Sequence, residues 1–182
     1  EECILKSVRS LETGVCHLYL AKFDNMSKEE LVSYISESRD DNIYAITRLL
    51  RMGVSVEELH EITKITNLFL ESFKKIVDME KALSENKNND EILAKAKIMG
   101  FSDTYIAKLW GVPEIEIYEK RKKLNLVPAF RMVDTMKTGK YLPYLYSSYT
   151  GDNSSILTEK KKIVVLGAGP IRIGQGVEFD YS

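Results

Sequence analysis

The sequence predicts a mainly α-helical protein: a helical domain with two helix-turn-helix-like units, an extended connector, and the first strand of a truncated α/β domain. Apolar residues recur at helical spacing through most of residues 15–126. Two prolines and a tyrosine-rich run then mark residues 127–162 as extended chain. The apolar run at 163–166 leads into several glycines, a pattern typical of a buried parallel strand that enters a phosphate-type loop.

The composition indicates a soluble globular protein. Its 182 residues provide for one domain of ordinary size plus part of another. The net charge of −1 gives no overall field that attracts nucleic acid or an anionic membrane. No apolar run reaches the roughly 20 residues that span a bilayer, and the acidic, amphipathic N-terminus "EECILKSVRSLETG" is no secretory signal. We therefore expect a cytoplasmic protein without membrane contact.

The cysteines and histidines predict neither a disulfide nor a metal site. Cys3 and Cys16 have no second pair and no histidine cluster nearby, so we expect two reduced, partly buried thiols. His17 and His60 lack companions at ligand spacing, so no metal site is expected at either.

Two helices are predicted between residues 27 and 53. Ser27 and Glu30 form a capping-box pattern that opens the first, whose inner face includes Leu31 and Ile35. The second ends at Gly53, a C′ glycine. Its apolar stripe is Ile43, Ile46, Leu49 and Leu50.

Two further helices follow before a polar break, "SENKNND". Ser55 and Glu58 predict a second capping box, and Asn67 is a candidate cap of the long helix after it. The apolar set of that long helix is Leu68, Phe69, Phe73, Ile76, Val77 and Leu83.

The second helical block, residues 91–126, repeats part of the first. "MGVSVEELHEITKITNLFLESFKK" (52–75) aligns without a gap on "MGFSDTYIAKLWGVPEIEIYEKRK" (99–122). Met, Gly and Ser coincide at the start, and apolar positions coincide through both copies. We interpret each copy as a short capped helix, a tight turn and a second helix, which indicates a structural repeat.

The second copy also has the layout of a DNA-binding helix-turn-helix, which is the alternative function. Ala107 would lie in the helix crossing, Gly111 in the turn and Ile115 on the inner face, with the basic run 120–123 on phosphates. However, the second helix opens with Glu114 and Glu116, whose negative charge is unfavourable next to DNA. Acids early and bases late are also what the helix dipole favours in a solvated helix.

Nothing in residues 1–150 has a catalytic pattern. Tyr105, Trp110 and Tyr118 could form a small-molecule platform, but their helical spacing favours core or interface positions. No Ser/His/Asp or Cys/His arrangement is present in the sequence of this region.

The C-terminal glycines form a loop of no specific ligand class. Gly167, Gly169 and Gly174 are candidates for close backbone approach, but Arg172 occupies the sixth position of a G-x-G-x-x-G fingerprint. The Gly-Lys-Ser/Thr of a P-loop is also missing. Spacing alone indicates a strand, a tight loop and a helix.

The residues themselves resemble a known family. "VLGAGPIRIGQGVEFDYS" resembles the start of the second synthetase half of the carbamoyl-phosphate synthase large subunit, and "FRMVDTMKTGKYLPYLYSSY" resembles the segment before it. "GVSVEELHEIT" and "GFSDTYIAKLWGV" resemble its oligomerisation domain, and "EECILKSVRSLETG" its first ATP-grasp half's last helix. Two places in the sequence depart from the family pattern. Met136 and Lys137 stand where the family commonly has Cys-Ala, and Ile171 stands where it often has a polar residue.

The resemblance implies a domain plan for a piece of a longer polypeptide. Residues 1–14 would be the tail of the first ATP-grasp half, and 15–126 the helical oligomerisation domain. Residues 127–162 would be the connector and linker, and 163–182 the truncated start of the second synthetase half.

The resemblance also implies a function. The family's full enzyme is an allosteric ligase that makes carbamoyl phosphate from bicarbonate, glutamine-derived ammonia and two ATP, for arginine and pyrimidine synthesis. Magnesium or manganese and potassium assist, and a small glutaminase subunit is the partner. This piece would be non-catalytic, without cofactor or nucleic acid, and would self-associate and hold the two halves in register.

The site residues implied by the resemblance lie near the C-terminus. Arg172, Gly176 and Glu178 fall in the stretch that lines the family's carbamate passage. A glycine would keep the bore open, and polar side chains would guide a small anion. The alternative is that all three residues only shape the first turn of a helix.

Overall fold

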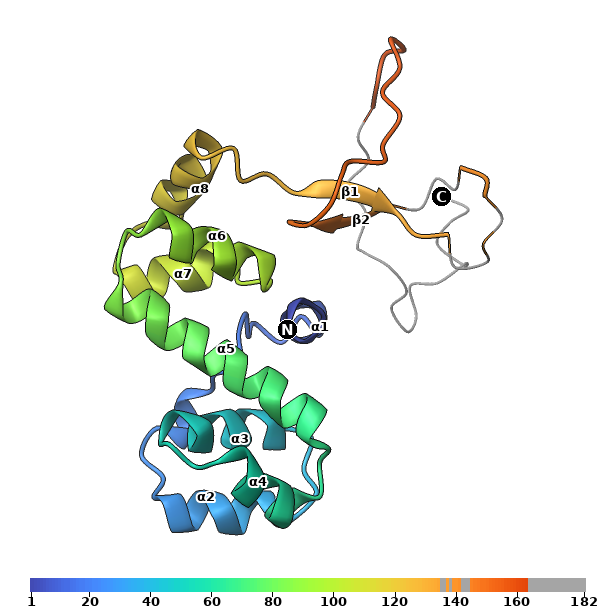
Figure 1. The fold of residues 1–182 in the computed structure, drawn as a ribbon. Helices are drawn as coiled ribbons and strands as arrows, with labels where there is room; N and C mark the ends of the chain where they lie inside the picture. Colours follow the sequence, from blue (N-terminus) through green and yellow to red (C-terminus); the bar gives the residue numbers. More distant parts are fainter. Residues whose placement is uncertain (135–136, 138, 142–144, 164–182) are drawn as a thin grey trace.

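The computed structural model describes residues 1–134, 137, 139–141 and 145–163 (Figure 1). Within these ranges the chain forms eight α-helices and one 3₁₀ helix, followed by a two-stranded sheet, so the mainly α class is confirmed. The helices are α1 (Glu2–Ser10), η1 (Ala21–Phe23), α2 (Lys28–Ile35), α3 (Asn42–Arg51), α4 (Val56–Thr63), α5 (Asn67–Glu85), α6 (Asp90–Ile98), α7 (Asp103–Trp110) and α8 (Glu114–Lys123). The strands are β1 (Ala129–Met132) and β2 (Leu145–Ser148).

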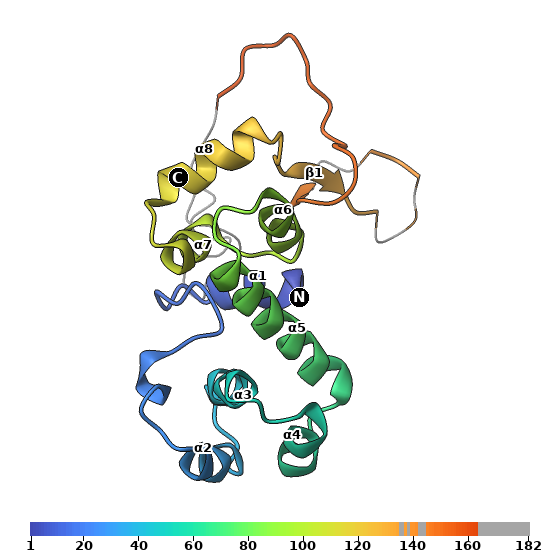
Figure 2. The same ribbon diagram turned by 60° about the vertical axis from the view of Figure 1, so that its left-hand side comes forward.

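The long helix α5 organises the molecule. It packs against α3 and α4 at one end and against α6 and α7 at the other. Figures 1 and 2 show α2–α4 gathered at one end of α5 and α6–α8 at the other, with α1 beside its middle. A single apolar core runs through the whole assembly, from Leu5 of α1 to Ile117 of α8.

The predicted start of α2 is confirmed. Ser27 Oγ accepts from the Glu30 backbone N–H at 3.2 Å, and the Glu30 carboxylate accepts from the Ser27 N–H at 2.8 Å. Both halves of the capping box are therefore formed. Leu31 and Ile35 are buried, as predicted.

The predicted start of α4 is only half correct. Ser55 Oγ accepts from the Glu58 backbone N–H at 3.1 Å. The Glu58 carboxylate does not return to Ser55, because it pairs with Lys28 Nζ of α2 at 2.9 Å. An ion pair between two helices thus replaces the second half of the capping box.

The predicted start of α5 is wrong in two respects. Its N-cap is Thr66, and Asn67 is the first helical residue. Leu68 and Phe69 are 73% and 53% exposed, whereas the rest of the predicted apolar set is buried. In the same turn Leu70 is fully buried, so α5 directs Leu70, and not Leu68 or Phe69, toward the core.

The predicted repeat is present in the backbone. α3 and α6 both end in a Schellman motif: Val54 N–H donates to Leu49 O at 3.1 Å, and Phe101 N–H donates to Ala96 O at 3.0 Å. The C′ glycines Gly53 and Gly100 have φ of +89° and +91°. Ten or so residues later, Lys64 and Gly111 are the left-handed C-caps of α4 and α7 (φ +58° and +72°).

The two C′ glycines, Gly53 and Gly100, differ in their surroundings. A Cβ on Gly100 would lie 2.9 Å from the Cα of Glu2, whereas a Cβ on Gly53 would meet nothing within 4 Å. The N-terminus of α1 therefore lies directly against the turn between α6 and α7.

We expect Gly100→Ala to destabilise the protein more than Gly53→Ala. Both variants place an L-residue at a strained φ, which costs about 1–2 kcal/mol. Gly100→Ala adds a backbone clash of about 1–3 kcal/mol. Chemical denaturation of the two variants measures the difference, and equal destabilisation would contradict the close packing of α1 on this turn.

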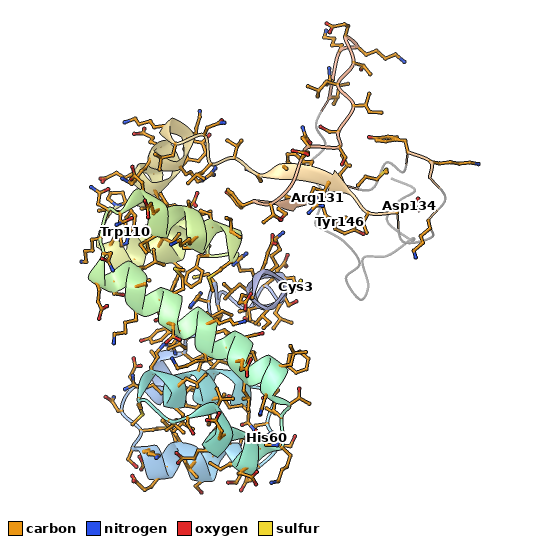
Figure 3. All side chains as sticks on the ribbon, in the orientation of Figure 1. Cys3, His60, Trp110, Arg131, Asp134 and Tyr146 are labelled. Carbon is orange, nitrogen blue, oxygen red and sulfur yellow. The ribbon has the colours of Figure 1, made fainter. Side chains whose placement is uncertain are left out.

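The connector contains a strand pair that the sequence did not reveal. β1 and β2 are antiparallel, with Ala129 opposite Ser148 and Arg131 opposite Tyr146 (Figures 1 and 3). The predicted extended chain is thus correct, and the pairing is new. The predicted strand 163–166 lies outside the described residues except for Ile163, which is exposed and in no strand.

The thiols differ from each other in exposure. Cys16 is half-buried as predicted, but Cys3 is exposed, and that prediction is wrong. Cys3 lies on the outer face of α1, whose buried face carries Leu5 and Val8.

Candidate association and linker site

The predicted loop and passage residues lie outside the part of the chain that the structure describes. They are Gly167, Gly169, Arg172, Gly174, Gly176 and Glu178. The candidate site is therefore built from the helical domain and the connector.

Glu80 of α5 joins the two repeats. Its Oε2 accepts from Arg51 Nη2 of α3 at 2.8 Å and from Arg51 Nε at 3.0 Å. Its Oε1 accepts from the Tyr105 hydroxyl of α7 at 2.6 Å. Arg51 also donates to the backbone oxygen of Leu18 at 2.7 Å, which ties in the segment after α1. One carboxylate therefore connects three helices and a loop.

His17 lies inside this junction without a hydrogen-bond partner. It is 1% exposed and stacks on the Tyr105 ring at 3.7 Å. Neither ring nitrogen makes a hydrogen bond; Nε2 is 3.8 Å from Glu80, which is too long for one. Burial lowers the pKa of His17, and the charges of Arg51 and Arg9 lower it further. The Glu80 carboxylate raises this pKa, but by less than the other effects lower it. His17 is therefore neutral at pH 7.

The environment of Glu80 keeps it ionised. Burial raises its pKa, but its hydrogen-bonded and charged neighbours outweigh burial and bring the pKa to about 2. We attribute this lowering to Arg51 and Tyr105, because a neutral His17 at 3.8 Å supplies neither a charge nor a hydrogen bond. Burial and the nearby carboxylate raise the pKa of Tyr105, so its hydroxyl stays a donor.

We expect stability to fall as the pH drops below about 6.5, the usual pKa of histidine. In that range the unfolded chain binds a proton at His17 while the folded chain does not, which costs up to about 1.4 kcal/mol per pH unit. His17→Phe keeps a ring against Tyr105 and removes the proton site. Urea denaturation between pH 7.5 and 5.5 should give a flatter stability profile for His17→Phe, and parallel profiles would contradict the role of His17.

A second polar cluster joins α6, α7 and α8. Asp103 accepts from Lys97 Nζ at 2.6 Å and from Arg121 Nε at 2.6 Å, and Lys97 also donates to Phe101 O at 2.7 Å. Lys97 is 4% exposed. Burial lowers its pKa, and the Asp103 carboxylate partly offsets this by raising it. The Tyr149 ring from the connector lies 4.8 Å from Lys97 Nζ. This cluster thus holds the second repeat together and contacts the connector.

The helix-turn-helix geometry of the second repeat is formed. Ala107 is buried and Gly111 lies in the turn, as predicted. Ile115 is 58% exposed, so its predicted inner position is wrong, because Ile117 is the residue that faces the core. Within the basic run, Lys120 pairs with Asp90 and Arg121 with Asp103, so two of the four bases serve helix packing.

The aromatic residues of the second repeat are mostly core residues. Tyr105 and Trp110 are buried, as predicted, and Trp110 Nε1–H donates to Leu83 O at 2.9 Å. Tyr118 is exposed, with the Arg121 guanidinium 4.7 Å from its ring centre. Figure 3 shows Trp110 on the far side of the helical domain from the sheet.

An apolar groove of about 510 Å³ runs between α1, α3 and α5. Its walls come from three helices that are distant in sequence. Two of the lining residues, Leu11 and Phe69, are exposed to solvent. The lining residues are Cys3, Ile4, Ser7, Val8, Leu11, Asp40, Ile43, Tyr44, Phe69 and Phe73. The groove therefore presents a mainly apolar concave surface.

The residues that the structure describes form neither a metal-binding group nor a membrane-spanning helix. No group of three His, Cys, Asp or Glu side chains there could hold a metal ion. No helix in the same residues is long and apolar enough to cross a membrane.

Sequence reasoning missed both polar clusters. The partners of Glu80 come from α3 and α7, so no local motif marks them. One signal was available for the second cluster. In the gap-free repeat, Lys97 and Asp103 replace Leu50 and Val56 of the first copy, and a charged pair at two inner positions predicts a buried ion pair.

Two family models match the chain. The model of the carbamoyl-phosphate synthetase large chain oligomerisation domain matches residues 1–125. The model of the carbamoyl phosphate synthase preATP-grasp domain matches residues 159–182. The first covers the helical domain from α1 to α8, including both polar clusters and the groove. The chain therefore belongs to the carbamoyl-phosphate synthetase large-chain family, with its oligomerisation domain in residues 1–125.

Proposed function

We propose that residues 1–125 are the self-association and linker module of a carbamoyl-phosphate synthetase large chain. The module is non-catalytic and holds the synthetase parts on either side of it in register. The observation that carries the proposal is the match of the helical domain to the oligomerisation model, together with the groove on its surface.

The parent activity is part of the same proposal. The full enzyme would be an ATP-dependent ligase that makes carbamoyl phosphate from bicarbonate and ammonia, with a small glutaminase subunit as ammonia source. ATP, magnesium or manganese, and potassium would bind outside residues 1–125. Arg172, Gly176 and Glu178 would line the carbamate passage, supported by the motif in which they lie and by the match at 159–182.

The groove between α1, α3 and α5 is the proposed contact with a second copy. Exposed contiguous apolar surface of this kind marks association sites. A two-fold dimer brings the same patch of both copies together, so Phe69 of each copy would contribute to one interface. The family match supports a second copy as the occupant, because its model is that of an oligomerisation domain.

We expect Phe69→Glu to weaken self-association. A charge at this position would be buried against apolar surface in the dimer, which weakens association by at least about tenfold. Light scattering behind a sizing column, over a hundredfold concentration range, measures the molar mass of each variant.

Ile115→Glu is the matched control, because Ile115 is also an exposed apolar residue in the first turn of its helix but lies outside the groove. Wild type and Ile115→Glu should associate and dissociate on dilution alike. A monomeric wild type at every concentration would refute self-association through residues 1–125. A Phe69→Glu variant that associates as strongly as wild type would place the interface elsewhere.

A further inference from the structure

The connector returns to the helical domain and attaches to α1. We call residues 129–132 and 145–150 the strap. Lys6 Nζ of α1 donates to Ser147 O of β2, and the Ser148 hydroxyl donates to Glu2 Oε2 of α1 at 3.1 Å. Glu2 and Lys6 are themselves paired at 2.8 Å, so one ion pair presents both a donor and an acceptor to β2.

Glu2 lies between the strap and the second repeat. Its Cα is against Gly100 in the α6–α7 turn, while its carboxylate accepts from Ser148. The end of the strap reaches the same repeat directly, because the Tyr149 ring lies near Lys97 and 6.0 Å from the Arg121 guanidinium. Figure 1 shows the sheet beside α1 and α6. Two attachments, one on α1 and one on the Asp103 cluster, therefore hold the strap.

The strap's own chain covers the outer edge of β1. Phe130 N–H donates to Asn153 Oδ1 at 3.2 Å, and Phe130 O accepts from Ser154 N–H at 2.8 Å. Gly151 makes this return possible, because its φ of +74° is a conformation that other L-residues rarely adopt. On the outer edge of β2, Lys6 Nζ donates to the carbonyl of Ser147.

Within the described residues, the strap contacts the helical domain through hydrogen bonds to α1 and through the Tyr149 ring beside Lys97 and Arg121. Every residue of β1 and β2 is half-buried or exposed, and Lys6 and Glu2 are partly exposed too. By contrast, the helices share a continuous buried apolar core. Elements with little buried apolar area and exposed hydrogen bonds open locally while the rest stays folded.

We infer that the strap is a releasable connection that fixes the chain leading to the preATP-grasp match at residue 159 against α1. While the strap is attached, the segments before and after the oligomerisation domain are held at one edge of the second repeat. When it detaches, the later segment moves independently of α1 without unfolding of the helices. This inference does not depend on self-association through the groove, which lies between α1, α3 and α5.

Hydrogen exchange of the whole chain tests the strap. In Lys6→Met/Ser148→Ala, peptides that contain 129–132 and 145–148 should exchange about tenfold faster, the effect of losing two modest hydrogen bonds. Peptides from α5 and α6 should be unchanged. Lys74→Met is the matched control, because Lys74 has a similarly exposed ion pair with Asp78, four residues away on its own helix α5.

The outcomes separate the strap from the proposed function. Unchanged exchange in the strap peptides would overturn the inference that α1 holds the strap. Equally faster exchange in α5 and α6 would show that the strap belongs to the cooperative core and is not releasable. The molar mass of the double variant should equal that of wild type, and a lower mass would show that the strap takes part in association.

Discussion

Glu80→Ala should be among the most destabilising single substitutions in the helical domain. The change removes the acceptor of Arg51 and of the Tyr105 hydroxyl, which are both largely buried. Breaking a buried pair by removing one partner costs about 3–5 kcal/mol, because the other charge stays buried without compensation. Chemical denaturation followed by circular dichroism measures this loss.

Glu71→Ala is the control on the same helix. Glu71 is exposed on α5, so its replacement should change the free energy of unfolding by less than about 0.5 kcal/mol. Glu80→Gln should be intermediate, because an amide still accepts from Tyr105 but carries no charge for Arg51. A Glu80→Ala variant as stable as Glu71→Ala would show that the junction of the two repeats is not held by this carboxylate.

The same carboxylate gives a pH dependence distinct from that of His17. The pKa of Glu80 in the folded state is about 2, below its usual value of 4.5. Its contribution is therefore fully present above pH 4.5 and is lost as the pH falls from 4.5 toward 2. The wild-type profile should thus fall in two ranges, and Glu80→Gln should make the fall in the lower range smaller, leaving the share of other carboxyl groups such as Asp41.

The parts of the fold that the sequence predicted are those with local causes. Ser27 and Ser55 mark helix starts, and Gly53 marks a helix end, because each interacts with backbone groups only a few residues away. The repeat was visible for the same reason, since its turns reuse the same residue types at the same spacing.

The sequence predictions were wrong where the burial of a residue depends on parts of the chain that are distant in sequence. Leu68, Phe69 and Ile115 fit a helical apolar period, yet they are exposed. In the same first turns, Leu70 of α5 and Ile117 of α8 are the residues that face the core. The exposed side chain of Phe69 is one of the residues that line the groove. Apolar periodicity therefore predicts which residues can be buried, while tertiary packing decides which of them remain available for association.

The polar clusters were missed for a related reason. Glu80 looks like any surface acid of a long helix, and only the fold brings Arg51 and Tyr105 to it. The predicted passage residues Arg172 and Glu178 stay predictions, because they lie outside the described residues.

Asp103→Ala should destabilise the second repeat about as much as Glu80→Ala destabilises the junction. Asp103 is the shared acceptor of Lys97 and Arg121, and Lys97 is almost fully buried. Its removal leaves a buried ammonium without a carboxylate, with the Phe101 carbonyl and the Tyr149 ring as its remaining contacts, at a cost of about 3–5 kcal/mol. Asp90→Ala is the matched control, because Asp90 is also the first residue of its helix and also pairs with a base of α8, but at an exposed site.

Asp90→Ala should cost only about 0.5–1 kcal/mol, from an exposed ion pair and the helix dipole. The double variant Lys97→Leu/Asp103→Val tests the cause of the larger loss. It installs the residues of the first repeat, Leu50 and Val56, at the equivalent positions. Because buried ion pairs can be replaced by apolar residues at little net cost, the double variant should recover most of the stability that Asp103→Ala loses. If it is as unstable as Asp103→Ala, then the unpaired Arg121, and not the buried Lys97, accounts for the loss.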